Sequence, residues 1–151
     1  MYLEQFIVIK RKPEVVWKFL GSVENVARWD RGVGRTQTTH KANERSVGLE
    51  FDTFVNEGGS DKGKMSYRIT DVGTSSCTVQ LTSKTGNARF FKRASWTFKT
   101  EPDLDGTLLV CGVDFALRLP FFFIAPLLYL KRSAISIDLN CLKQAIEAIP
   151  E

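Results

Sequence analysis

The apolar residues of this chain recur at every second position through its middle and at helical spacing near its end. Between residues 47 and 119, apolar and polar side chains alternate in segments separated by short polar turns, as in strands with one buried face. Apolar residues of the last part follow one another at intervals of 7, 4, 3, 4 and 3, typical of one helix face: Leu128, Ile135, Leu139, Leu142, Ile146 and Ile149. The two periods predict an antiparallel sheet covered by one long C-terminal helix.

Turn residues divide the chain into consecutive strands with short connections, which favours a meander. We expect strands over 2–10, 47–56, 64–72, around 77–81, over 89–100 and over 107–119, with 33–40 as an edge strand. In the segment 89–100 the alternation assigns Phe90, Ala94, Trp96 and Phe98 to one face and Phe91 to the other. Two short helices precede the sheet. The first begins at Pro13 and ends at Gly21, and the second runs from Ser22 to about Trp29.

Size and charge limit the class of protein. A chain of 151 residues buries roughly 70% of its unfolded surface, so we expect one domain over 1–151. A net charge of +4 is too low for a typical nucleic-acid partner. Three dispersed cysteines indicate no disulfide framework, and neither a signal peptide nor an apolar run long enough to span a bilayer is recognisable. These features favour a cytoplasmic protein.

Two segments carry a family resemblance. Residues 12–29, with Trp17, Phe19 and Trp29, and residues 96–110, with their Pro/Asp/Gly loop, resemble the polyketide cyclase/dehydrase and lipid-transport group of the START-like (Bet v 1-like, SRPBCC) superfamily. The resemblance implies an α+β helix-grip fold: a curved antiparallel sheet of six to seven strands, two short N-terminal helices and a long C-terminal helix. It also implies an apolar cavity between the sheet and that helix.

The strand and helix patterns predict which residues face such a cavity. Pockets for small molecules are concave and mostly apolar, with few polar groups. The candidate ligand-binding residues are Phe51, Met65, Tyr67, Leu81, Phe90, Trp96, Phe115, Phe122, Leu128 and Arg132. The same side chains also fit a filled core. Lys92, Lys131 and Arg132 lie near the apolar faces, where they can meet an anionic head group or extend to solvent.

No constellation for catalysis stands out, so the catalytic residues stay unassigned. His40 is the only histidine and has no nucleophile beside it in sequence. One histidine and three scattered cysteines give no metal-ligand spacing, and no nucleotide-binding loop is present. We therefore expect neither metal nor cofactor. Asp52, Asp71 and Asp114 alternate with the apolar positions, which predicts solvated surface carboxylates.

The apolar segment 117–130 supports a separate hypothesis. Phe121, Phe122 and Phe123 cannot all face inward on a helix, and two cations, Lys131 and Arg132, follow. Exposed apolar patches mark interaction sites. The segment is predicted to touch a membrane surface, to pack in a homodimer, or to form a buried lid.

Three functions remain open. The first is binding or transport of a small hydrophobic ligand, lipid or polyketide-like. The second is an enzyme of the cyclase/dehydratase type. The third, which similar folds also include, is a protein-interaction module or a quinone chaperone.

Overall fold

The computed structural model describes residues 1–38, 45–55, 63–130 and 132–150. Its elements, with η for 3-10 helices, are β1 (Tyr2–Ile9), α1 (Pro13–Leu20), η1 (Val23–Asn25), α2 (Val26–Trp29), β2 (Arg35–Thr38), β3 (Glu50–Phe54), β4 (Met65–Val72), β5 (Ser76–Leu81), η2 (Gly86–Phe90), β6 (Phe91–Asp103), β7 (Gly106–Leu117), η3 (Phe121–Ile124), α3 (Ala125–Tyr129) and α4 (Arg132–Glu147). The predicted α+β class and the two short N-terminal helices are confirmed.

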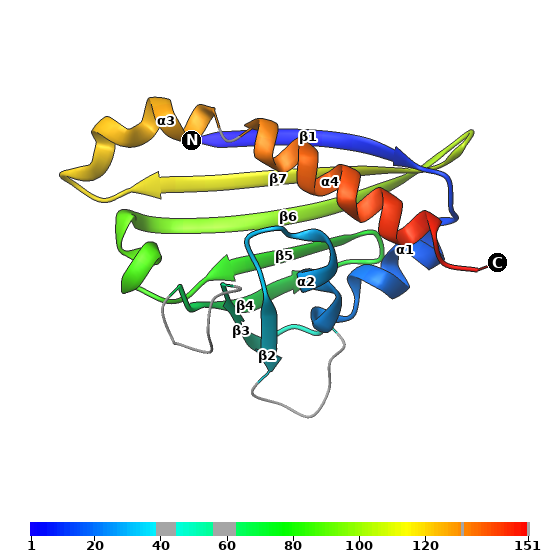
Figure 1. The fold of residues 1–151 in the computed structure, drawn as a ribbon, viewed down its shortest axis with the longest axis horizontal. Helices are drawn as coiled ribbons and strands as arrows, with labels where there is room; N and C mark the ends of the chain where they lie inside the picture. Colours follow the sequence, from blue (N-terminus) through cyan, green and yellow to red (C-terminus); the bar gives the residue numbers. More distant parts are fainter. Residues whose placement is uncertain (39–44, 56–62, 131, 151) are drawn as a thin grey trace.

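The strands form one antiparallel sheet of seven strands in the order β1-β7-β6-β5-β4-β3-β2. From β2 to β7 each strand pairs with its neighbour in sequence, as the meander predicts, while β1 returns to the far edge and pairs with β7. The sheet curves, and α4 crosses its concave face, with α1 and α2 at one side of it (Figure 1). This is the expected helix-grip arrangement.

Helix α4 is held by its apolar stripe and by a set of polar contacts at its C-terminal end. Leu139, Leu142 and Ile146 are buried against residues of α1, β1 and β7. The Lys143 ammonium donates to the Val8 carbonyl at 2.6 Å and to Glu147 at 2.7 Å. Arg11 donates to the Glu147 and Ile149 carbonyls, which satisfies acceptors that a helix end leaves open.

Two details differ from the sequence prediction. A register shift between Phe91 and Arg93 reverses the expected parity, so Phe91 packs inward, edge to face on Phe115 at 6.0 Å. A bulge changes which side chains share a face, and alternation alone does not reveal it. Phe90 consequently belongs to η2 rather than to the inner face of β6.

The predicted C-terminal helix is divided in two. α3 ends at Tyr129 and α4 begins at Arg132, and Ile135 in the first turns of α4 contacts both core clusters. Leu128 contacts the cluster around Phe115, whereas Leu139 and the residues after it contact the cluster around Ile9 and Leu109. Phe121 to Ile124 form a short 3-10 helix just before α3. The observed edge strand β2 is shorter than 33–40, and residues 39 and 40 lie outside the described residues.

Candidate functional site

A cavity of about 100 Å³ lies between the inner face of the sheet and α2. Its walls come from α2 and the residue after it, from the segment before β3, and from strands β3 to β6: Val26, Trp29, Asp30, Arg45, Phe51, Tyr67, Val79, Trp96 and Phe98. The alternation of each strand brings one or two of its side chains to this face. The N-terminal helical segment and the sheet thus build the cavity together, and most of its lining is apolar.

Aromatic rings form most of the wall. Phe51 stacks on Tyr67 with ring centroids 5.3 Å apart, and Tyr67 meets the edge of Trp96 at 5.5 Å. Trp29 packs edge to face on Phe98 at 6.0 Å. Such pairs fix ring positions beyond what area burial alone provides. The arrangement offers flat apolar surfaces to a ligand ring.

Arg45 is the cationic group of the cavity. Its Nε donates to the Leu20 carbonyl at 2.5 Å, its Nη1 lies 3.9 Å from Cys77 Sγ, and its Cζ lies 5.9 Å from the Phe98 ring centroid. Burial lowers the pKa of Arg45, and the neighbouring Cys77 partly opposes this. No carboxylate of the described residues pairs with this guanidinium. It is therefore a donor for an anionic or acceptor oxygen inside an apolar site.

Asp30 and Tyr67 supply the other polar groups. Burial raises the pKa of Asp30, although its Oδ1 accepts the Gly32 N–H at 2.9 Å, which acts in the opposite direction. Burial also raises the pKa of Tyr67 to about 12, so that side chain is a neutral hydroxyl near pH 7. The cavity therefore combines a carboxyl group that protonates more readily than usual, a phenol and a guanidinium.

Three of the ten candidate binding residues line this cavity: Phe51, Tyr67 and Trp96. Four others, Met65, Leu81, Phe115 and Leu128, belong to a core cluster under β6, β7 and α3. Because Trp96 and Tyr67 also contact that cluster, it adjoins the cavity.

The last three candidates lie outside the cavity. Phe90 packs edge to face on Phe121 at 4.9 Å. Phe122 is exposed, and Arg132 is exposed at the first position of α4. Lys131 and His40 lie outside the described residues.

The sequence analysis missed Asp30 and Arg45. Asp30 is the C-cap of α2, just past the end of the predicted second helix, while Arg45 precedes β3 without regular structure. Neither residue lies in a segment with a regular apolar period, so the sequence does not predict which way its side chain points. Val79 and Phe98 could have been found, because both share the face of residues that the strand alternation placed inward.

The expected surface carboxylates lie on the outer side. Asp52 pairs with Lys64 at 3.6 Å and Asp114 with Arg93 at 2.8 Å, while Asp71 is exposed. In the part of the chain that the structure describes, no group of three or more metal-ligating side chains occurs. The described helices include none with the length and apolar character needed to cross a bilayer.

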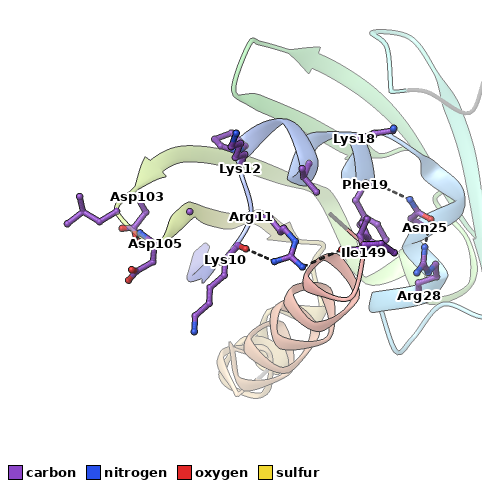
Figure 2. Close-up of a pocket in the computed structure, with 15 residues that line it drawn as sticks. Lys10, Arg11, Lys12, Lys18, Phe19, Asn25, Arg28, Asp103, Asp105 and Ile149 are labelled. Atoms are coloured by element: carbon purple, nitrogen blue, oxygen red, sulfur yellow. Dashed lines mark hydrogen bonds between the residues drawn. The ribbon is translucent and has the colours of Figure 1, made fainter.

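A larger hollow of about 1010 Å³ lies outside the sheet–helix interface, between the β1–α1 connection, the β6–β7 hairpin and the C-terminal end. Its lysines Lys10, Lys12 and Lys18 point away from one another (Figure 2), and Arg28 donates to Asn25 at 3.3 Å. Arg11 is used by the two carbonyls after α4, and Asp103 and Asp105 line the far side. Without converging groups, this groove has the character of a junction rather than of a built site.

Three solved structures share the whole fold. A protein from Mesorhizobium loti superposes with a TM-score of 0.76 at 15% identity, covering 100% of both chains. The Zhui aromatase/cyclase from Streptomyces sp. R1128 gives 0.75 at 16% identity, over 97% of this chain and 93% of that one. Norcoclaurine synthase from Thalictrum flavum gives 0.73 at 10% identity, over 99% and 95%. No curated protein matches the sequence significantly.

Fold and cavity together define a helix-grip protein of the START-like (Bet v 1-like) class. The sequence profile of the family described as polyketide cyclase / dehydrase and lipid transport matches residues 3–144, so the chain belongs to that family. The resemblance found in residues 12–29 and 96–110 is thereby confirmed.

Proposed function

We propose that the protein binds a small hydrophobic molecule by taking one of its rings, with an attached oxygen, into the cavity beside α2. The observation that carries this proposal is the union of aromatic walls with a guanidinium that has no described carboxylate partner. The rings supply stacking surface, and Arg45 supplies a charge-assisted donor. The family's description, which includes polyketide and lipid ligands, supports a hydrophobic ligand class.

The volume of the cavity limits what enters it. An apolar cavity of about 150 Å³ holds one benzene molecule, whereas ligand pockets commonly span about 300–1,000 Å³. The 100 Å³ here is smaller than both, so a short chain fits inside, while a ring enters with part of it protruding. A polyketide-like or lipid ligand would place only one end inside.

Tryptophan fluorescence provides the test, because Trp29 and Trp96 line the cavity. Titration with benzoate should change the emission saturably. Val79→Phe fills the cavity and should weaken benzoate binding at least tenfold. Val113→Phe makes the same change in the neighbouring core cluster and should leave the affinity within about threefold. Equal weakening in both variants, or none in either, would contradict the proposed site.

Acid–base catalysis on the bound ring is a second candidate, favoured by Asp30. A general acid or base works best with a pKa near the working pH, and burial moves the pKa of Asp30 upward. Two proteins with this fold are named as an aromatase/cyclase and a synthase.

A substrate-trapping comparison separates the two functions. Wild type and Asp30→Asn, purified from the native host, would be extracted and their small molecules compared by mass spectrometry. An enzyme should retain in the variant a precursor that is missing from the wild type. A binding protein should yield the same molecule from both, and that result would reject the catalytic candidate.

A further inference from the structure

We propose that the end of the molecule formed by η3 and α3 docks on an anionic lipid surface. The surface in question, the apolar tip, consists of Leu119, Phe122, Phe123, Leu127 and Leu130. Their exposed fractions are 82, 64, 66, 64 and 72%. Single exposed apolar residues are ordinary, but a contiguous group of large ones marks an interaction surface.

The apolar tip is a folded and anchored part of the chain. Phe121 packs on Phe90 of η2, and Leu128 packs on the core cluster around Phe115. Arg118 donates to the carbonyls of Phe90 and Phe91, both at 2.9 Å. Yet neither η3 nor α3 contains a buried residue. The anchors hold two short helices in place with their large apolar side chains turned outward.

The segments that form and flank the apolar tip carry cations and no carboxylate. Glu4 on β1 already accepts from Tyr2 at 2.6 Å, and Asp114 on β7 pairs with Arg93 at 2.8 Å. Segments 72–100 and 115–137 contain none of the 17 acidic residues. These segments supply η2, the start of β6, the end of β7, η3, α3 and the start of α4, which lie together toward one end of the molecule (Figure 1). Arg89, Lys92 and Arg132 are exposed there, and none of the three pairs with a carboxylate of the described residues. An apolar tip with a cationic border results.

This combination fits an anionic membrane better than a second copy of the chain. In a symmetric dimer the same patch meets itself, so the cationic border of one copy would face that of the other, with no carboxylate of these segments to compensate. A bilayer that contains anionic lipids offers apolar depth and negative head groups together. Since no described helix is long and apolar enough to span a bilayer, the tip would lie in the interface.

Flotation of the full chain with lipid vesicles tests the proposal. Wild type should bind vesicles of phosphatidylglycerol and phosphatidylcholine at least tenfold better than vesicles of phosphatidylcholine alone, and 0.5 M salt should reduce this binding. Phe122→Ser with Phe123→Ser should weaken binding at least tenfold, because both rings are lost from the tip. Phe6→Ser is the matched control, since Phe6 is 70% exposed on β1. It should stay within twofold of wild type.

A second pair of variants tests the charges. Lys92→Gln with Arg132→Gln should weaken binding on the order of tenfold or more, since each surface cation contributes on the order of fivefold. Lys12→Gln with Lys18→Gln removes the same charge from the groove of Figure 2 and should have a much smaller effect. Circular dichroism verifies that each variant is folded.

The outcomes separate the proposal from its alternatives. If wild type does not float with anionic vesicles, or if tip and control variants float equally, the docking surface is rejected. If wild type is instead a dimer in sedimentation, and the two tip serines make it monomeric without any vesicle binding, the tip is a homodimer interface. Benzoate binding in the cavity should be unchanged by the tip variants, so this proposal and the ligand-binding proposal can fail independently.

Discussion

Arg45 carries a buried charge, and buried charges in proteins are usually paired with an opposite charge. Its described partners are a carbonyl, a thiol and an aromatic ring, and burial lowers its pKa. The ionised guanidinium is thus held at a cost to stability that a bound anion would offset. We therefore expect the buried charge of Arg45 to serve ligand binding rather than folding. A variant whose stability and ligand affinity are measured separately tests this expectation.

For Arg45→Met we expect little change in stability and a large change in ligand preference. Removing the charge relieves its desolvation, while the Leu20 carbonyl loses its donor, so the free energy of unfolding should stay within about 1 kcal/mol of wild type. Benzoate affinity should fall at least tenfold, whereas benzyl alcohol, a neutral ring of similar size, should bind within threefold of wild type. Equal losses for both probes would show that Arg45 only shapes the cavity.

Asp30 gives a prediction about pH. Because its pKa is raised by burial, the folded protein keeps the proton at pH values where the unfolded chain has released it. The contribution of Asp30 to the free energy of unfolding is therefore fully present below the ordinary carboxyl pKa. It is lost as the pH rises through the pKa that Asp30 has in the folded protein. Asp30→Asn still offers an oxygen to the Gly32 N–H. As the pH rises from the ordinary carboxyl pKa through the folded pKa, this variant should become more stable relative to wild type. A pH-independent difference in urea unfolding would contradict this assignment.

At the scale of elements, the periodic parts of the chain were predictable and the interruptions were not. Alternation placed Phe51, Tyr67 and Trp96 on the inner face, and the stripe of α4 predicted Leu139, Leu142 and Ile146 as buried. The register shift at Phe91 and the division between α3 and α4 interrupt these periods. Tertiary packing decides such features, and a single sequence does not display it.

The grip of α4 yields an element-level prediction. Leu142 is fully buried between α1, β1 and β7, so Leu142→Ala should lower the free energy of unfolding by about 2–5 kcal/mol. Ile137→Ala removes a large apolar side chain from the exposed face of the same helix and should cost less than about 1 kcal/mol. Urea unfolding compares the two. Similar losses would mean that helix propensity, rather than burial of the stripe, holds α4 in place.

At the scale of the whole molecule, the apolar stripe of α4 packs on residues of β1, β6 and β7, and a small space remains beside α2. Two core clusters fill the sheet–helix interface, one around Leu109 and one around Phe115. Trp96 packs against both and also lines the cavity. Trp96, together with Tyr67, therefore lies between the cavity and the cluster in which Met65, Leu81 and Phe115 lie. The inward-facing residues predicted from the strand pattern are thus divided between the cavity and this filled cluster.

Shortening Trp96 should enlarge the cavity toward this cluster and change the size of the ligand that fits. Wild type should bind benzoate better than 2-naphthoate, since its cavity is too small for two fused rings. Trp96→Leu should reverse this order, while its smaller packed area should lower stability by a few kcal/mol (on the order of 1–5). Trp17→Leu is the matched control, because Trp17 packs in the core, donates to Thr100 at 2.7 Å and does not line the cavity. It should lose stability and keep the wild-type order of affinities. If wild type already prefers 2-naphthoate, Trp96 does not limit the site and the ligand-binding space is larger than the single ring proposed above.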